Sequence, residues 1–167
     1  MAINAAHWHL LLNHIPVIGV PMVAMLLIWG LTKMNEAMVR LALLATIVMG
    51  AATWVADLTG GKAEHEIKDA KYAWVSRERI HDHEEAADKA EIAAIATGVL
   101  ALGVLVMARG GKPPHRAATY GMLFGLGITA VILGWASWEG GKIRHDEFGL
   151  TPTLDQAPIP GETPPRP

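Results

Sequence analysis

The chain of 167 residues contains no cysteine. This absence excludes disulfide bonds, thiolate-bound copper, cysteine-ligated iron–sulfur clusters and covalently attached c-type haem. Charged residues make up 18% of the chain and aromatic residues only 6%, and the net charge is −2. We expect no nucleic-acid partner. Any metal or redox chemistry must therefore use histidine, carboxylate or methionine side chains.

Charge is nearly absent from four long apolar segments, at about residues 8–31, 37–56, 92–107 and 117–138. A helix needs roughly 20 apolar residues to cross the core of a bilayer. The third segment meets this length only if its polar start reaches the lipid headgroups. The fourth segment has no polar face, which a helix of a soluble bundle would show. We therefore predict an all-α, integral membrane four-helix bundle over residues 1–149, followed by a proline-rich extended tail at 150–167.

Four spans place both termini and the connection 60–87 on one side of the membrane, and two short loops on the other. The loops, at 33–40 and 109–116, hold five of the 14 basic residues but only one of the 16 acids. Basic residues close to helix ends favour the cytoplasmic side. We predict a protein of the bacterial inner membrane, with the termini and the 60–87 connection extracytoplasmic.

The chain also repeats itself. The pattern His-x-His begins at residues 7 and 81, and Gly-Gly-Lys-x-x-His begins at residues 60 and 140. These motifs predict two tandem two-helix repeats, at about 7–66 and 81–147. Both have the same orientation, so a pseudo-two-fold axis along the membrane normal would relate them. We expect the two Gly-Gly-Lys turns to end the second and fourth helices, since glycine favours a helix C-cap.

Seven of the eight histidines then lie on the extracytoplasmic side, and only His115 lies on the other. Neutral imidazole is a common metal ligand and holds haem iron axially. His14 is the strongest single candidate, because an ionisable group about two turns into an apolar segment is costly. The predicted cofactor-binding residues are His14, His83, His9, His145 and His65. For a bare metal ion the candidates are His7, His9, His14, His81, His83 and Asp88.

Several functions remain open at this point. The first is a membrane redox subunit that binds haem b, or otherwise a metal ion such as zinc or copper held by three histidines and a carboxylate. The second is a cofactor-free accessory subunit of a larger membrane complex, with the tail 151–167 and the connection 62–87 as docking segments. The histidines would then only bond headgroups, backbone or each other. Transport along the histidines is disfavoured, because the fourth segment has no ionisable group. No complete catalytic motif is present, so independent catalysis is not expected.

Three motifs resemble a family of bacterial four-helix membrane proteins, the domain-of-unknown-function family numbered 2231. They are H-L-L-L-N-H-x-P at 9–16, H-E-E-A-A at 83–87 and G-G-K-I-R-H-D-E-F-G at 140–149. In the last motif the histidine comes one or two places earlier than in the family pattern. The resemblance implies a role for His9, His14, His83 and His145. Some relatives are joined to Rieske-type domains, which implies an electron-transfer setting. In the redox-subunit hypothesis, the partner would be a quinone or a periplasmic electron carrier.

Overall fold

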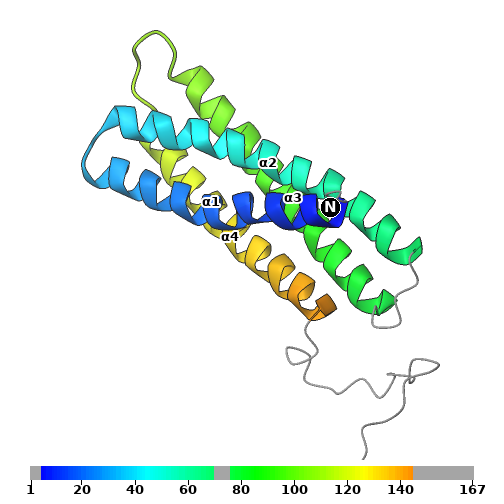
Figure 1. Cartoon of the computed structure of the whole chain (residues 1–167). Helices are drawn as coiled ribbons and strands as arrows, with labels where there is room; N and C mark the ends of the chain where they lie inside the picture. The colour runs from blue at the N-terminus through cyan, green and yellow to red at the C-terminus, as the bar shows by residue number, and fades with distance from the viewer. Residues whose placement is uncertain (1–4, 70–75, 145–167) are drawn as a thin grey trace, which may run out of the picture.

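The computed structural model describes residues 5–69 and 76–144. These residues form four α-helices and no strand: α1 (Ala5–Thr32), α2 (Glu36–Asp69), α3 (Arg77–Met107) and α4 (Arg116–Arg144). Each helix packs against its neighbour in sequence, and α1 also packs against α4, so the four close into a ring (Figure 1). Because the connections between successive helices are short, neighbouring helices run antiparallel, and the bundle has an up-down-up-down topology. The prediction of an all-helical four-helix bundle is confirmed, while the tail 150–167 lies outside the described residues.

The outer surface of the bundle carries many large apolar residues, and its interior combines alanines with leucines and valines. All four helices are long and apolar enough to cross a membrane. Large apolar side chains point outward along every helix, among them Met22, Met25, Leu44, Val48, Val99, Leu100, Phe124 and Val131. The buried positions include many alanines, such as Ala42, Ala94 and Ala101. Small residues inside and large apolar residues outside suit close helix packing and contact with lipid.

Helices α2 and α3 both extend into the predicted connection between the second and third membrane spans. α2 continues to Asp69 and α3 already begins at Arg77, so most of the expected 60–87 connection is helix. Ser76 caps α3, since its hydroxyl accepts a hydrogen bond from the backbone N–H of Arg79 at 3.4 Å. This is the usual role of serine at an N-cap. The polar ends of both helices therefore extend the bundle beyond the apolar segments.

The expectation that the two Gly-Gly-Lys turns end helices is wrong. Gly60 and Gly140 lie inside α2 and α4, which continue for several residues beyond them. A glycine C-cap requires a positive φ. Among the described residues, the glycines with positive φ are Gly110 and Gly111, in the α3–α4 connection. The glycines at 60 and 140 serve helix packing instead, as described below.

Threonines supply the polar atoms of the bundle core. Five are buried: Thr46, Thr53, Thr97, Thr119 and Thr129. Each hydroxyl lies within hydrogen-bond distance of the carbonyl four residues earlier in its own helix. The hydroxyl oxygens of Thr97 and Thr129 also lie 3.0 Å apart. Since a hydroxyl has a single proton, one of these two donates to the other rather than to its own helix, and this bond joins α3 to α4. These bonds leave no threonine hydroxyl of this core unpaired.

Arg40 stabilises the end of the bundle where α2 begins and α3 finishes. Its Nη2 donates to the carbonyl of Ala108 at 3.1 Å and to that of Lys112 at 2.5 Å, so the start of α2 holds the α3–α4 connection. We expect Arg40→Gln to lower the free energy of unfolding by about 1–3 kcal/mol, because charged hydrogen bonds to two carbonyls are lost. Denaturant titration in mild detergent measures this change. Arg109→Gln, at an exposed position of the same end, is the control. Equal stability of the two variants would contradict the role of Arg40.

Candidate functional site: a histidine pair at one end of the bundle

Helices α1 and α3 begin at the end of the bundle where α2 and α4 finish (Figure 1). Most of the described histidines lie at this end. Six of the seven described histidines lie there: His7, His9, His14, His65, His81 and His83. His115 lies at the other end, immediately before α4. His145 is outside the described residues. The bundle therefore places these six histidines at a common end, as the alternation of the helices requires.

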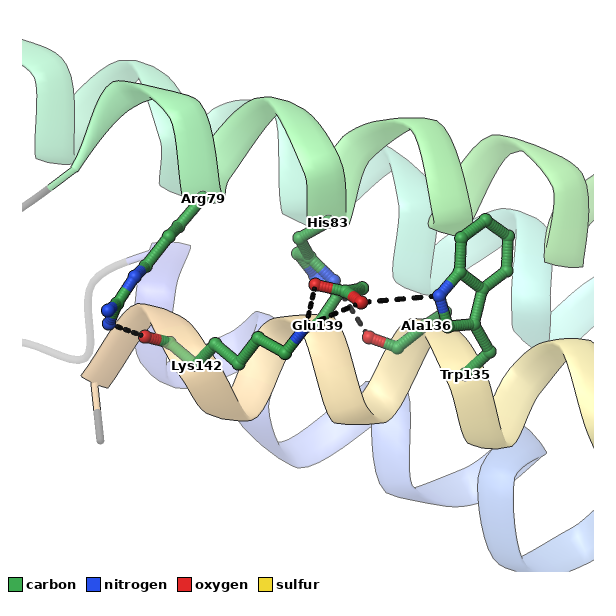
Figure 2. A network of polar contacts seen from close by, with 6 residues as sticks. All are labelled: Arg79, His83, Trp135, Ala136, Glu139 and Lys142. Carbon is green, nitrogen blue, oxygen red and sulfur yellow. Dashed lines mark hydrogen bonds and ion pairs between the residues drawn. The ribbon is translucent and has the colours of Figure 1, made fainter. Parts of the chain in front are cut away.

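Two of these histidines reach across the bundle in the same way. Nδ1 of His9, on α1, lies 3.0 Å from the carbonyl oxygen of Ala56 on α2. Nδ1 of His83, on α3, lies 2.9 Å from the carbonyl oxygen of Ala136 on α4 (Figure 2). The two imidazole rings contact each other edge-on, with their centres 6.2 Å apart and an angle of 67° between their planes. The pair therefore joins all four helices at one point.

The carbonyl bonds fix the tautomer of both rings. A carbonyl oxygen only accepts hydrogen bonds, so Nδ1 must carry the proton in each case. In a neutral imidazole the other nitrogen, Nε2, then keeps its lone pair. An Nδ1–H bond to a backbone carbonyl is also the arrangement that orients metal-bound histidines. The carbonyl bonds thus leave Nε2 as the acceptor nitrogen of both rings.

A glycine makes room for each ring. A Cβ atom added at Gly60 would lie 3.0 Å from Cε1 of His9, and one added at Gly140 would lie 3.0 Å from Cε1 of His83. Each glycine comes four residues after the carbonyl that its histidine contacts, hence on the same helical face. The same three-part contact of histidine, carbonyl and glycine thus occurs between α1 and α2 and again between α3 and α4.

An ion-paired carboxylate lies beside His83. Glu139 of α4, with a side chain only 12% exposed, pairs with Nζ of Lys142 at 2.8 and 2.9 Å and accepts a hydrogen bond from the indole of Trp135 at 3.2 Å. Arg79 adds a bond to the carbonyl of Lys142 at 2.6 Å. Figure 2 shows this network next to the imidazole. Its cation and donors leave little net charge on this side of the pair.

The surroundings of His9 differ from those of His83. Asp57 follows the carbonyl-bearing Ala56 directly and interacts with both His9 and Asp88. Glu91 interacts with the same two aspartates. Three acids thus lie within electrostatic reach of one another on the α2–α3 side. The two imidazoles therefore make the same contacts with the backbone, whereas the charged residues around them differ.

The other predicted ligands do not join the pair. His14 is exposed, and its Nδ1 lies 2.5 Å from the carbonyl of Leu10 in its own helix. His81 is exposed and 3.9 Å from Glu84. His7 and His65 are exposed as well, as is Asp88. Within residues 5–69 and 76–144, no three His, Cys, Asp or Glu side chains form a group that could hold a metal ion.

Sequence reasoning named His9 and His83 but missed their surroundings. The partners it missed are the two helix carbonyls, Asp57 and Glu139. The spacing of 80 residues between Gly60 and Gly140 held a usable signal, because it also relates Ala56 to Ala136. The repeated Gly-Gly-Lys pattern predicts helix ends, whereas in the structure Gly60 and Gly140 lie against the imidazoles.

Comparison of the chain with family models, with curated proteins and with solved structures finds no match. The resemblance to the family numbered 2231 therefore stays a prediction from its three motifs.

Proposed function

We propose that the chain is an integral membrane redox subunit that holds one metal centre, haem b or a bare ion, between His9 and His83. The proposal rests on the pair His9 and His83, whose rings contact each other and make the same bond to a backbone carbonyl. Two imidazoles from different helices contact each other, and both have Nδ1 on a backbone carbonyl and a free lone pair on Nε2. In this proposal the pair lies at the extracytoplasmic end, because the opposite end carries the basic loops.

The closeness of the two rings supports a shared metal. Their centres lie 6.2 Å apart. A metal bound here would be held by His9 and His83, each through Nε2, because Nδ1 of both rings is bonded to a backbone carbonyl.

We infer further that the two halves of the chain are tandem repeats. His9 and His83 are 74 residues apart, while Ala56 and Ala136, like Gly60 and Gly140, are 80 apart. Related spacings that bring related residues into the same contact support a duplication. A pseudo-two-fold axis would then pass through the metal centre, and each half would supply one ligand.

The function of such a centre is to accept and release one electron. The protein supplies the ligands, the apolar surroundings and the charges that set the potential, and the metal supplies the electron chemistry. Its partners would be a membrane quinone on one side of the reaction and a periplasmic electron carrier on the other. The chain itself would break and form no covalent bonds.

Protein purified from membranes tests this proposal. We expect either an α-band in the visible spectrum of the reduced protein, which identifies haem b, or a stoichiometric transition metal by elemental analysis. The two results distinguish haem from a bare ion. A blank spectrum together with no stoichiometric metal would contradict the proposal.

One observation favours a second function, that of a cofactor-free accessory subunit. Four glycines, Gly103, Gly121, Gly127 and Gly134, have no atom within 4 Å of an added Cβ, so they face open space on α3 and α4. Outward small residues allow a helix of another membrane subunit to approach closely. In that case the histidine pair would serve only to join helices, and the spectrum and metal analysis would both be blank.

A further inference from the structure

The end of the bundle opposite the histidine pair carries an excess of positive charge. The two short loops there, 33–40 and 109–116, contain five basic residues and one acid, Glu36. Four of the basic residues are exposed: Lys33, Arg109, Lys112 and Arg116. Within residues 5–69 and 76–144, none of these four forms an ion pair with a carboxylate. Their charge is therefore available to an anion from outside the protein.

Contacts between the two loops bring the cations together. The guanidinium of Arg116, at the start of α4, contacts the sulfur of Met34 in the α1–α2 connection. Arg40, at the start of α2, donates to the carbonyl of Lys112 in the other loop. Since Met34 follows Lys33 directly and α1 packs against α4, Lys33 and Arg116 lie close to the place where the end of α1 meets the start of α4. Two cations at one seam suit a phosphate, which offers negative charge and several acceptor oxygens.

Arg116 stands at the outer end of an exposed row on α4. Arg116, Tyr120, Phe124 and Ile128 follow one another at four-residue spacing, and all are exposed. Residues at this spacing share one face of a helix. From the end of the bundle inward, the row presents a cation, a phenol ring and two apolar side chains. Tyrosine is typical of the headgroup level of a bilayer, so the row follows the order of phosphate, interface and acyl chain in a phospholipid.

A row on α1 has the same order. Lys33, Trp29 and Met25 also follow at four-residue spacing and are exposed. The backbone N–H of Lys33 donates to the carbonyl of Trp29 at 3.0 Å, so Lys33 continues the last turn of the helix. Its Nζ lies 5.2 Å from the centre of the Trp29 ring. An exposed indole lies at the headgroup level, and the ammonium group beside it is therefore placed at the level of the lipid phosphates.

We propose that the seam between α1 and α4 at this end binds an anionic glycerophospholipid, with Lys33 and Arg116 on its phosphate and the two exposed rows along its acyl chains. The inference rests on the membrane placement in the proposed function but not on the metal centre, which lies at the other end of the bundle. A free phosphate would meet the cations and leave both apolar rows uncovered, which favours a lipid as the occupant. Basic residues close to a membrane surface each strengthen the binding of anionic lipid by about fivefold.

Native mass spectrometry of the full-length protein in detergent tests the inference, with phosphatidylglycerol and phosphatidylcholine as the two probes. Phosphatidylcholine has the same phosphate, but its own cation offsets the charge. We expect the first phosphatidylglycerol to bind more tightly than phosphatidylcholine. Lys33→Gln combined with Arg116→Gln should lower the affinity for phosphatidylglycerol by about 25-fold and leave that for phosphatidylcholine nearly unchanged.

A matched control removes one lysine and one arginine from exposed positions at the histidine end. Lys62→Gln combined with Arg77→Gln should leave the affinity for the first phosphatidylglycerol unchanged. Glycerol phosphate, which has the headgroup charge without acyl chains, should bind far more weakly than the lipid. Lys33→Arg combined with Arg116→Lys, which keeps both charges, should retain lipid binding.

Equal affinity of the wild type for the two lipids would overturn the site without recourse to any variant. Equal losses in the two Gln double variants would also overturn it, because net charge alone would then govern binding. Glycerol phosphate binding as tightly as phosphatidylglycerol would overturn the assignment to a lipid. The visible spectrum and the metal content are read from the same protein samples, so failure of the lipid site is distinguished from failure of the metal centre.

Discussion

Replacing His9 or His83 with alanine should abolish the metal centre. Each variant should lose at least about 100-fold in metal affinity, since a direct ligand contributes more than the supporting groups whose loss costs 10–100-fold. The two effects should be nearly equal, because both imidazoles have the same carbonyl bond and the same glycine seat. Equilibrium titration and the metal content of the purified protein measure the change.

His14→Ala and His81→Ala are the matched controls for the pair. They remove exposed imidazoles from the same two helices and should leave the metal content unchanged. Loss of the metal in His14→Ala with retention in His83→Ala would show that the wrong histidines have been paired.

Adding a methyl group at Gly60 or Gly140 should damage the same site. These glycines lie on α2 and α4, which face the helices that carry the two histidines. The new Cβ would lie 3.0 Å from Cε1 of the facing imidazole, so the ring must move and its carbonyl bond must weaken. Overpacking of this kind costs about 1–3 kcal/mol of unfolding free energy, which exceeds the gain of up to about 1 kcal/mol from the higher helix propensity of alanine. We expect Gly60→Ala and Gly140→Ala to lower both the stability and the metal affinity, as measured by denaturant titration in detergent and by metal binding.

The neighbouring glycines provide an internal control one residue away. Gly61 and Gly141 have nothing within 4 Å of an added Cβ. Alanine there should stabilise the helix by up to about 1 kcal/mol, because alanine has the higher helix propensity, and should not affect metal binding. Equal responses at positions 60 and 61, or at 140 and 141, would refute the proposed seating of the imidazoles.

The helices could be predicted from the sequence because their signal is strong. Uncharged runs such as 117–138 determine element type and approximate position without tertiary information. The ends could not be predicted as well. Residues 60–69 continue α2 although the Gly-Gly pair suggested a stop, because packing against the ring of His9 favours a glycine within the helix. Tertiary contact thus outweighed local propensity.

The site was predictable only to the level of candidate residues. The His-x-His motifs identified His9 and His83, but the sequence could not distinguish them from His14, which the helix turns toward the outside. Rotation about the helix axis decides which histidine points inward, and that rotation depends on packing with the neighbouring helices.

The most direct test of the central claim is a count of the imidazoles bound to the metal. Pulsed EPR of the metal-loaded protein, prepared with ¹⁵N-labelled histidine, gives this number from the couplings of the ligand nitrogens. We predict two histidines in the wild type and one in each of His9→Ala and His83→Ala, if any metal is retained. A wild-type protein with one coordinated histidine or none would contradict the shared centre.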